Sequence, residues 1–209
     1  MAIKLEELYE ILYNYYGPQG WWPGEGLEIA IGAILTQQTS WISVEKAIQN
    51  LKDANCLNIK CLETIHIEKL ETLIKPSGYY RIKARRLKNF IELISKNPTP
   101  SREELLLVNG LGLETADSVL LYWFEEPYFV IDVYTYRILE RLGINSDNDY
   151  LELQRIFIDN LPKDIEMYKE FHALLVQHAK SHCLKNHPKC DACPLNKHCS
   201  FHIRKAEIL

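Results

Sequence analysis

The sequence lacks the long apolar run that a membrane-spanning segment requires. None of its hydrophobic stretches approaches the ~20 residues needed to cross a bilayer. The first residues, MAIKLEELYE, place acidic residues early and contain no apolar core segment, so we expect no secretory signal, no membrane partner and a cytoplasmic location. With 47% hydrophobic and 25% charged residues over 209 positions, the composition excludes disordered and fibrous proteins.

The sequence also lacks the excess of basic residues that many DNA-binding proteins carry. The formal net charge is −4, which on its own counts against a nucleic-acid partner. Residues 75–88, however, contain six basic residues, no acidic residue and interleaved tyrosines, and residues 180–189 are again basic without acids. A solvated helix face usually mixes both signs, so we interpret these segments as phosphate-contacting surfaces. The candidate contacts are Arg81, Lys83, Arg85, Lys185 and Lys189.

No segment shows the polar and apolar alternation of a half-buried strand. Apolar residues instead recur at three- and four-residue spacing, which predicts an all-α fold. Ser43 is the expected cap of the third helix, and Asp132 and Gly143 bracket a later one. Helices are predicted over residues 3–16, 27–36, 43–53, 66–75, 81–96, 101–108, 115–124, 133–142, 149–160 and 164–180.

Four of the six cysteines lie within seventeen residues near the C-terminus, as Cys183, Cys190, Cys193 and Cys199. Their spacing, C-x6-C-x2-C-x5-C, contains only one knuckle of the kind that structural zinc sites use in pairs. A compact loop of four thiolates suits an iron–sulfur cluster, and spacing alone leaves zinc and disulfides open as alternatives. Cys56 and Cys61 are interpreted as small buried hydrophobic residues. The isolated histidines show no ligand spacing and receive no role: His66, His172, His178 and His198.

Two glycines, Gly110 and Gly112, separate two predicted short helices. Such a turn lets backbone N–H groups approach an anion at the start of the second helix, although a Gly-x-Gly between helices is more often only a turn. Twenty residues later, Asp132 follows an apolar run, where an aspartate is normally a helix N-cap.

These motifs together resemble the endonuclease III family and its helix–hairpin–helix superfamily of DNA glycosylases. The cysteine spacing is similar to that family's iron–sulfur loop, and the resemblance implies a [4Fe–4S] cluster held by the four cysteines. It also implies that Gly110, Gly112 and Thr115 grip a DNA phosphate, with a monovalent cation at the hairpin. Asp132 stands at the position of the catalytic aspartate, whose carboxylate suits the oxocarbenium-like transition state of N-glycosidic cleavage.

One departure from the family pattern is informative. Bifunctional members carry a lysine just before the Thr-Ala pair, and its amine attacks the sugar to form a Schiff base. Here that position is Glu114, which has no amine. We therefore predict a monofunctional glycosylase with water as the nucleophile.

An unusual loop, Trp21-Trp22-Pro23, and the segment around Trp41 supply candidate pocket aromatics. These aromatic residues have two structural interpretations, as a cover over the core or as an anchor between subdomains. The functional interpretation is that they stack on an extruded base. Gln38, or else Gln37, resembles the family's glutamine that fills the space of the flipped nucleotide. The set looks like the 3-methyladenine-DNA glycosylase III type, which implies an alkylated purine, whose positive charge indole rings favour.

The resemblance implies two helical subdomains flanking a DNA groove. One is a helical barrel over 27–131 that includes the helix–hairpin–helix at 101–124. The other joins 1–26 to 132–209 and includes the cluster loop at 183–199. The expected partner is double-stranded DNA with a damaged base, bound by a monomer in the nucleoid. A glycosylase for uracil or thymine mispairs or oxidised bases, with or without lyase activity, a non-catalytic iron–sulfur DNA-binding protein and an unrelated zinc protein remain the alternatives.

Overall fold

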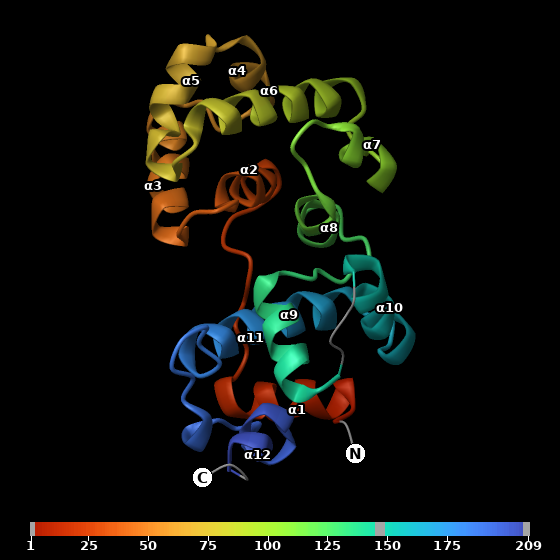
Figure 1. Cartoon of the computed structure of the whole chain (residues 1–209). Coiled ribbons are helices and arrows are strands. Elements are labelled where there is room, and N and C mark those ends of the chain that lie inside the picture. Colours follow the sequence, from red (N-terminus) through yellow and green to blue (C-terminus); the bar gives the residue numbers. More distant parts are fainter. Residues whose placement is uncertain (1–2, 145–148, 207–209) are drawn as a thin grey trace. The chain divides into compact units, whose positions relative to one another are not determined.

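The computed structural model describes residues 3–144 and 149–206, and every regular element in these ranges is a helix (Figure 1). The predicted all-α fold class is therefore confirmed. No helix of this described part is long and apolar enough to cross a membrane.

The chain forms two compact units. The inserted unit is contiguous, Pro23–Glu125, and the terminal unit combines Met1–Trp22 with Glu126–Leu209. The inserted unit contains α2 (Leu27–Thr36), α3 (Trp41–Asp53), α4 (Ile59–Thr64), α5 (Ile67–Leu73), η1 (Lys75–Ser77), α6 (Tyr80–Lys96), α7 (Arg102–Leu107) and α8 (Leu113–Tyr122). The terminal unit contains α1 (Leu5–Tyr16), α9 (Val133–Leu142), α10 (Tyr150–Asn160), α11 (Ile165–Ser181), η2 (Cys190–Ala192), η3 (Asn196–His198) and α12 (Ser200–Ala206).

Helix α2 is the central element of the inserted unit. Its nearly continuous apolar sequence has no polar face, and all residues from Ile29 to Leu35 are buried. Such a helix must be covered on several sides. It packs against α3, α6 and α8, so the helix that follows the glycine turn rests directly on this core.

The terminal unit is built on α11, which packs against α1 and α9. An aromatic cluster fills the space beside it. The rings of Phe129 and Phe157 stack with centroids 3.8 Å apart, and Phe171 and Tyr168 meet this pair edge-on. The cluster fixes the chain just before Asp132, since Phe129 lies three residues upstream of it.

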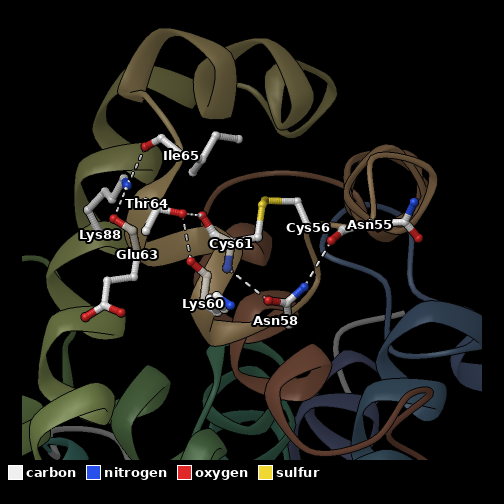
Figure 2. Close-up of a disulfide and its surroundings, with 9 residues drawn as sticks. All are labelled: Asn55, Cys56, Asn58, Lys60, Cys61, Glu63, Thr64, Ile65 and Lys88. Atoms are coloured by element: carbon white, nitrogen blue, oxygen red, sulfur yellow. Dashed lines mark hydrogen bonds between the residues drawn. A yellow bond between two sulfur atoms is a disulfide. The ribbon is translucent and has the colours of Figure 1, made fainter.

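Two local predictions are wrong. The third helix begins at Trp41 rather than after Ser43, because the Ser40 side chain caps it by accepting a hydrogen bond from the Ser43 backbone N–H. Cys56 and Cys61 are not separate hydrophobic residues but form a disulfide (Figure 2). The first turn of α4 brings their Cα atoms to 5.1 Å, within disulfide range.

Candidate functional site

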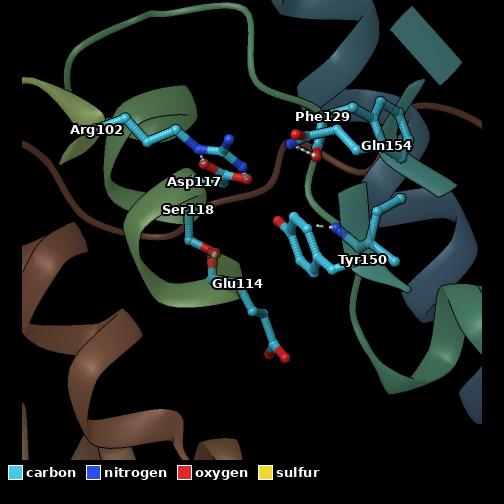
Figure 3. A network of polar contacts seen from close by, with 8 residues as sticks. Arg102, Glu114, Asp117, Ser118, Phe129, Tyr150 and Gln154 are labelled. Atoms are coloured by element: carbon cyan, nitrogen blue, oxygen red, sulfur yellow. Dashed lines mark hydrogen bonds and ion pairs between the residues drawn. The ribbon is translucent and has the colours of Figure 1, made fainter. Parts of the chain in front are cut away.

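The segment that leads to Asp132 is held by two side chains of α10. The buried Gln154 amide donates to the Phe129 carbonyl at 2.7 Å, and the Tyr150 hydroxyl accepts from the Ile131 N–H at 3.4 Å (Figure 3). A non-helical segment has no helical hydrogen bonds of its own, so these contacts satisfy its polar groups and limit its motion. The carboxylate that follows is thus attached to a fixed backbone.

Asp132 is the N-cap of α9, as predicted from its place after an apolar run. Its Oδ1 accepts hydrogen bonds from the N–H of Tyr134 at 3.0 Å, the N–H of Thr135 at 2.7 Å and the Thr135 hydroxyl at 2.9 Å. These donors and the positive end of the helix dipole favour the charged form of the carboxyl.

The second carboxylate oxygen of Asp132 faces a histidine. His172 of α11 places its Nε2 3.6 Å from Oδ2, and both side chains are largely buried. Burial acts to raise the pKa of the Asp132 carboxyl, but the contacts from His172 and Thr135 outweigh it and hold that pKa below its ordinary value. His172 carried no signal in the sequence, because a lone histidine on an apolar helix face is indistinguishable from a core residue.

The glycine turn joins α7 to α8 as predicted. Gly110 adopts φ +89°, which favours glycine, and a Cβ there would collide with the Arg86 side chain. Gly112 is different: its backbone is extended, and a Cβ there would meet nothing within 4 Å. The conformational requirement therefore lies at Gly110 alone, while Gly112 is the exposed N-cap of α8, with Glu114 exposed in its first turn.

The two glutamines after α2 differ sharply. The Gln37 amide donates to the Gly110 carbonyl at 3.2 Å and to the Thr115 hydroxyl at 2.9 Å, and its oxygen accepts from Arg86. Gln37 thus ties the end of α2 to the glycine turn. Gln38 is exposed, in the left-handed region at φ +55°. Of the two candidates for filling the space of a flipped nucleotide, Gln38 is exposed, whereas Gln37 is half-buried and engaged with the glycine turn.

A buried ion pair fixes α8 to α7. The Arg102 guanidinium donates two hydrogen bonds of 2.6 Å to the Asp117 carboxylate, which has no exposed surface (Figure 3). This two-pronged geometry is the strong form of an arginine–carboxylate pair. At the start of α7, Ser101 and Glu104 form a reciprocal capping box. Both helices that flank the turn are therefore held in place.

The candidate pocket aromatics divide between the units. Trp21 and Trp22 meet edge-to-face at 5.3 Å in the terminal unit, where the Lys180 ammonium lies 5.6 Å from the Trp21 ring centre. Pro23 and Trp41 belong to the inserted unit, and the Trp41 indole N–H donates to Glu45 at 2.9 Å. One face of Trp21 is already covered by a cation.

The basic segment of α6 requires one correction. Arg81 and Arg85 are exposed, as are Lys185 and Lys189 of the cysteine loop. Lys83 is only 1% exposed, and its ammonium donates to the carbonyls of Leu35 at 2.8 Å and Ser77 at 2.7 Å. Burial, with the nearby Arg86, lowers the pKa of Lys83 to about 8. The predicted phosphate contact at Lys83 is wrong, because the side chain points into the unit and satisfies the last turn of α2.

The four C-terminal cysteines line one small cavity, together with His178 and Arg141. Arg141 of α9 donates to the Cys183 sulfur at 3.2 Å, and His178 of α11 lies 3.6 Å from the Cys193 sulfur. Burial and the neighbouring thiols raise the pKa of Cys193 to about 11. Among residues 3–144 and 149–206, no three His, Cys, Asp or Glu side chains form a group that could hold a metal ion.

Comparison with known proteins places these features in context. Residues 31–163 match the model of the HhH-GPD superfamily of base excision DNA repair proteins. A protein from Methanocaldococcus jannaschii, named as a candidate DNA repair glycosylase, is 46% identical over 92% of this chain and 94% of its own length. Endonuclease III of Thermotoga maritima is 30% identical over 86% of this chain and 84% of its own.

A solved structure agrees with the sequence relatives. The crystal structure of the H. pylori 3-methyladenine DNA glycosylase MagIII, bound to 1,N6-ethenoadenine, is 30% identical to this chain with a TM-score of 0.78. The match covers 85% of this chain and 98% of that protein. The chain therefore belongs to the HhH-GPD superfamily of base excision DNA repair proteins, and it is a DNA repair glycosylase of that superfamily.

Proposed function

We propose that the protein is a monofunctional glycosylase that hydrolyses the N-glycosidic bond of an extruded, alkylated purine such as 3-methyladenine. The observation that carries the proposal is the Asp132 carboxylate, which is fixed by three hydrogen bonds and kept ionised. A fixed anion stabilises the positive charge that develops on the sugar when the bond to the base breaks.

The steps balance without a cofactor. The C1′–N bond breaks and its electron pair neutralises the positively charged alkylated base, which leaves. A water oxygen bonds to C1′, and its proton passes to Oδ2 of Asp132. The position where a Schiff-base amine would be needed holds Glu114, which supports water as the nucleophile.

Three further assignments belong to the proposal. Gln38 fills the space of the extruded nucleotide, because Gln37 is engaged with the glycine turn. The turn, at Gly110, Gly112 and Thr115, receives a phosphate. The candidates for contact with the extruded base are Trp21 and Trp22 in the terminal unit and Pro23 and Trp41 in the inserted unit.

We also propose that Cys183, Cys190, Cys193 and Cys199 hold a [4Fe–4S] cluster. Their thiols are soft ligands, and they line one cavity. The chemistry of this donor set suits a cluster, because each iron takes one thiolate, although the four sulfurs of the described structure do not form a ready metal-binding group. The cluster is assigned no catalytic step; it would connect the loop to α9 and α11. Absorbance near 400 nm that disappears in Cys193→Ser tests this assignment.

The test of the activity is a panel of duplexes with one lesion each, assayed with and without alkali. The panel holds 3-methyladenine, 1,N6-ethenoadenine, mispaired uracil and thymine, thymine glycol and 8-oxoguanine. We expect release of an alkylated purine, strand cleavage only after alkali, and loss of release in Asp132→Asn. The likeness to endonuclease III, whose name denotes a strand-cutting enzyme, supports the second candidate, a glycosylase for another lesion with lyase activity. Cleavage without alkali, trapped by borohydride, would establish that candidate instead.

A further inference from the structure

The imidazole of His172 lies next to Oδ2 of Asp132, the carboxylate oxygen that does not take part in the helix cap. All three hydrogen bonds described above end on Oδ1, whereas His172 approaches Oδ2, at 3.6 Å. This histidine is 4% exposed and belongs to α11, forty residues further along the chain than Asp132. The packing of α11 against α9 is what brings the two side chains together.

The charge environment of the Asp132 carboxylate comes from a small set of groups. Thr135 and Tyr134 donate to it from its own helix, and His172 is the titratable side chain that acts on it from α11. The contribution of His172 exceeds that of Thr135 in opposing the effect of burial. A largely buried carboxylate without such a neighbour would take up a proton more readily.

We propose that His172 is a positioning residue for the glycosylase reaction: it fixes the rotation of the Asp132 carboxyl and keeps Oδ2 unprotonated for the attacking water. The inference rests on the proposed role of Asp132. Oδ1 is fully used by the N-terminus of α9, so Oδ2 is the oxygen left to face the sugar and the water. A 3.6 Å separation shortens into a hydrogen bond with a small shift of the ring, as contacts of this kind do when substrate binds.

Two replacements distinguish the hydrogen-bond donor of the His172 ring from the volume that the ring fills. His172→Phe keeps a ring of similar size but removes the N–H. His172→Gln brings an amide N–H close to the position of Nε2. The matched control is Leu175→Ala, which opens a cavity one turn along the same helix at a residue with no exposed surface. Thermal unfolding of each variant, followed by circular dichroism, sets a temperature at which all are folded.

Two measurements are needed, and the first does not depend on activity. Carboxyl ¹³C NMR gives the Asp132 pKa, which we expect to rise in His172→Phe and to stay near its native value in Leu175→Ala. The second is the single-turnover rate on whichever duplex of the lesion panel is processed fastest. We expect about a tenfold loss or more in His172→Phe, with the acid limb of the pH–rate profile moved to higher pH, and substantial recovery in His172→Gln.

The outcomes distinguish this inference from the proposed function. An unchanged Asp132 pKa in His172→Phe overturns the positioning role, whatever the activity. Equal loss of rate in His172→Phe and Leu175→Ala, with no shift of the acid limb, shows a packing role only and also overturns it. If Asp132→Asn keeps full activity, the proposed mechanism fails, while the NMR result for His172 still stands on its own.

Discussion

Removing one partner of the Arg102–Asp117 pair should destabilise the helices around the glycine turn more than any surface charge change. Asp117 has no exposed side-chain surface and Arg102 is 14% exposed, so neither charge can be rehydrated while the unit stays folded. Breaking such a pair from one side costs about 3–5 kcal/mol, because the remaining charge stays buried. We expect Arg102→Met to lose this amount of unfolding free energy.

For a chain of this length, 1 kcal/mol corresponds to about 2–4 °C in Tm, so the expected fall is roughly 6–20 °C. Thermal unfolding followed by circular dichroism measures it. The double variant Arg102→Met/Asp117→Leu should recover most of the loss, since replacing both charges by apolar groups is often neutral.

The matched control is the Lys96–Glu92 pair, which is equally short, at 2.6 Å, but exposed on both sides. Lys96→Met should leave the Tm unchanged, because solvent screens such pairs. An exposed ion pair contributes at most about 1 kcal/mol to the unfolding free energy. If Arg102→Met loses no more than this, burial does not determine the energy of the Arg102–Asp117 pair, and the reasoning is refuted.

Three further predictions follow from the inserted unit. Glu114→Lys should form a covalent adduct with abasic DNA that borohydride traps, because the exposed first turn of α8 gains an amine. The native chain should form none, and a gel shift after trapping measures the difference. Burial lowers the pKa of Lys83 from 10.5 to about 8 in the folded state, so below pH 8 folding carries the free-energy cost of burying a charged amine. As the pH rises from 8 to 10.5, the folded state loses this proton before the unfolded state does, and the stability of the fold increases. Urea unfolding should show the native chain gaining at most about 3 kcal/mol over that range relative to Lys83→Met, whose curve stays flatter. Reducing the disulfide should lower the unfolding free energy by about 2 kcal/mol, from the entropy of its short loop, and reductant should have no effect on Cys56→Ser/Cys61→Ser.

The predictions that succeeded from sequence depend on local rules. The N-cap at Asp132, the C-cap at Gly143 and the two helices around Gly110 follow from residue types at fixed offsets, which act through neighbours in the chain. The predicted helix over 27–36 is likewise present as α2, and its nearly continuous apolar sequence matches its burial on every side.

What failed or was missed depends on contacts between distant segments. Lys83 lies in a segment with the composition of a basic surface. Its ammonium nevertheless points inward, where it donates to the carbonyls of Leu35 and Ser77. His172 looked like an ordinary core histidine until the packing of α11 placed it at Asp132. Neither contact leaves a periodic or spaced pattern, so a single sequence contains no signal for it.

The discontinuity of the terminal unit has a consequence for synthesis on the ribosome. Helix α1 packs on α11 through Tyr9 and Phe171 and through the Tyr16–His178 hydrogen bond, yet about 150 residues separate the two helices. At about 5–20 residues per second, α1 waits roughly 8–30 s for its partner, while the contiguous unit between them can already fold. A nascent chain that stalls before α11 would expose the apolar face of Leu5, Leu8 and Leu12, and it is this intermediate that we expect chaperones to bind.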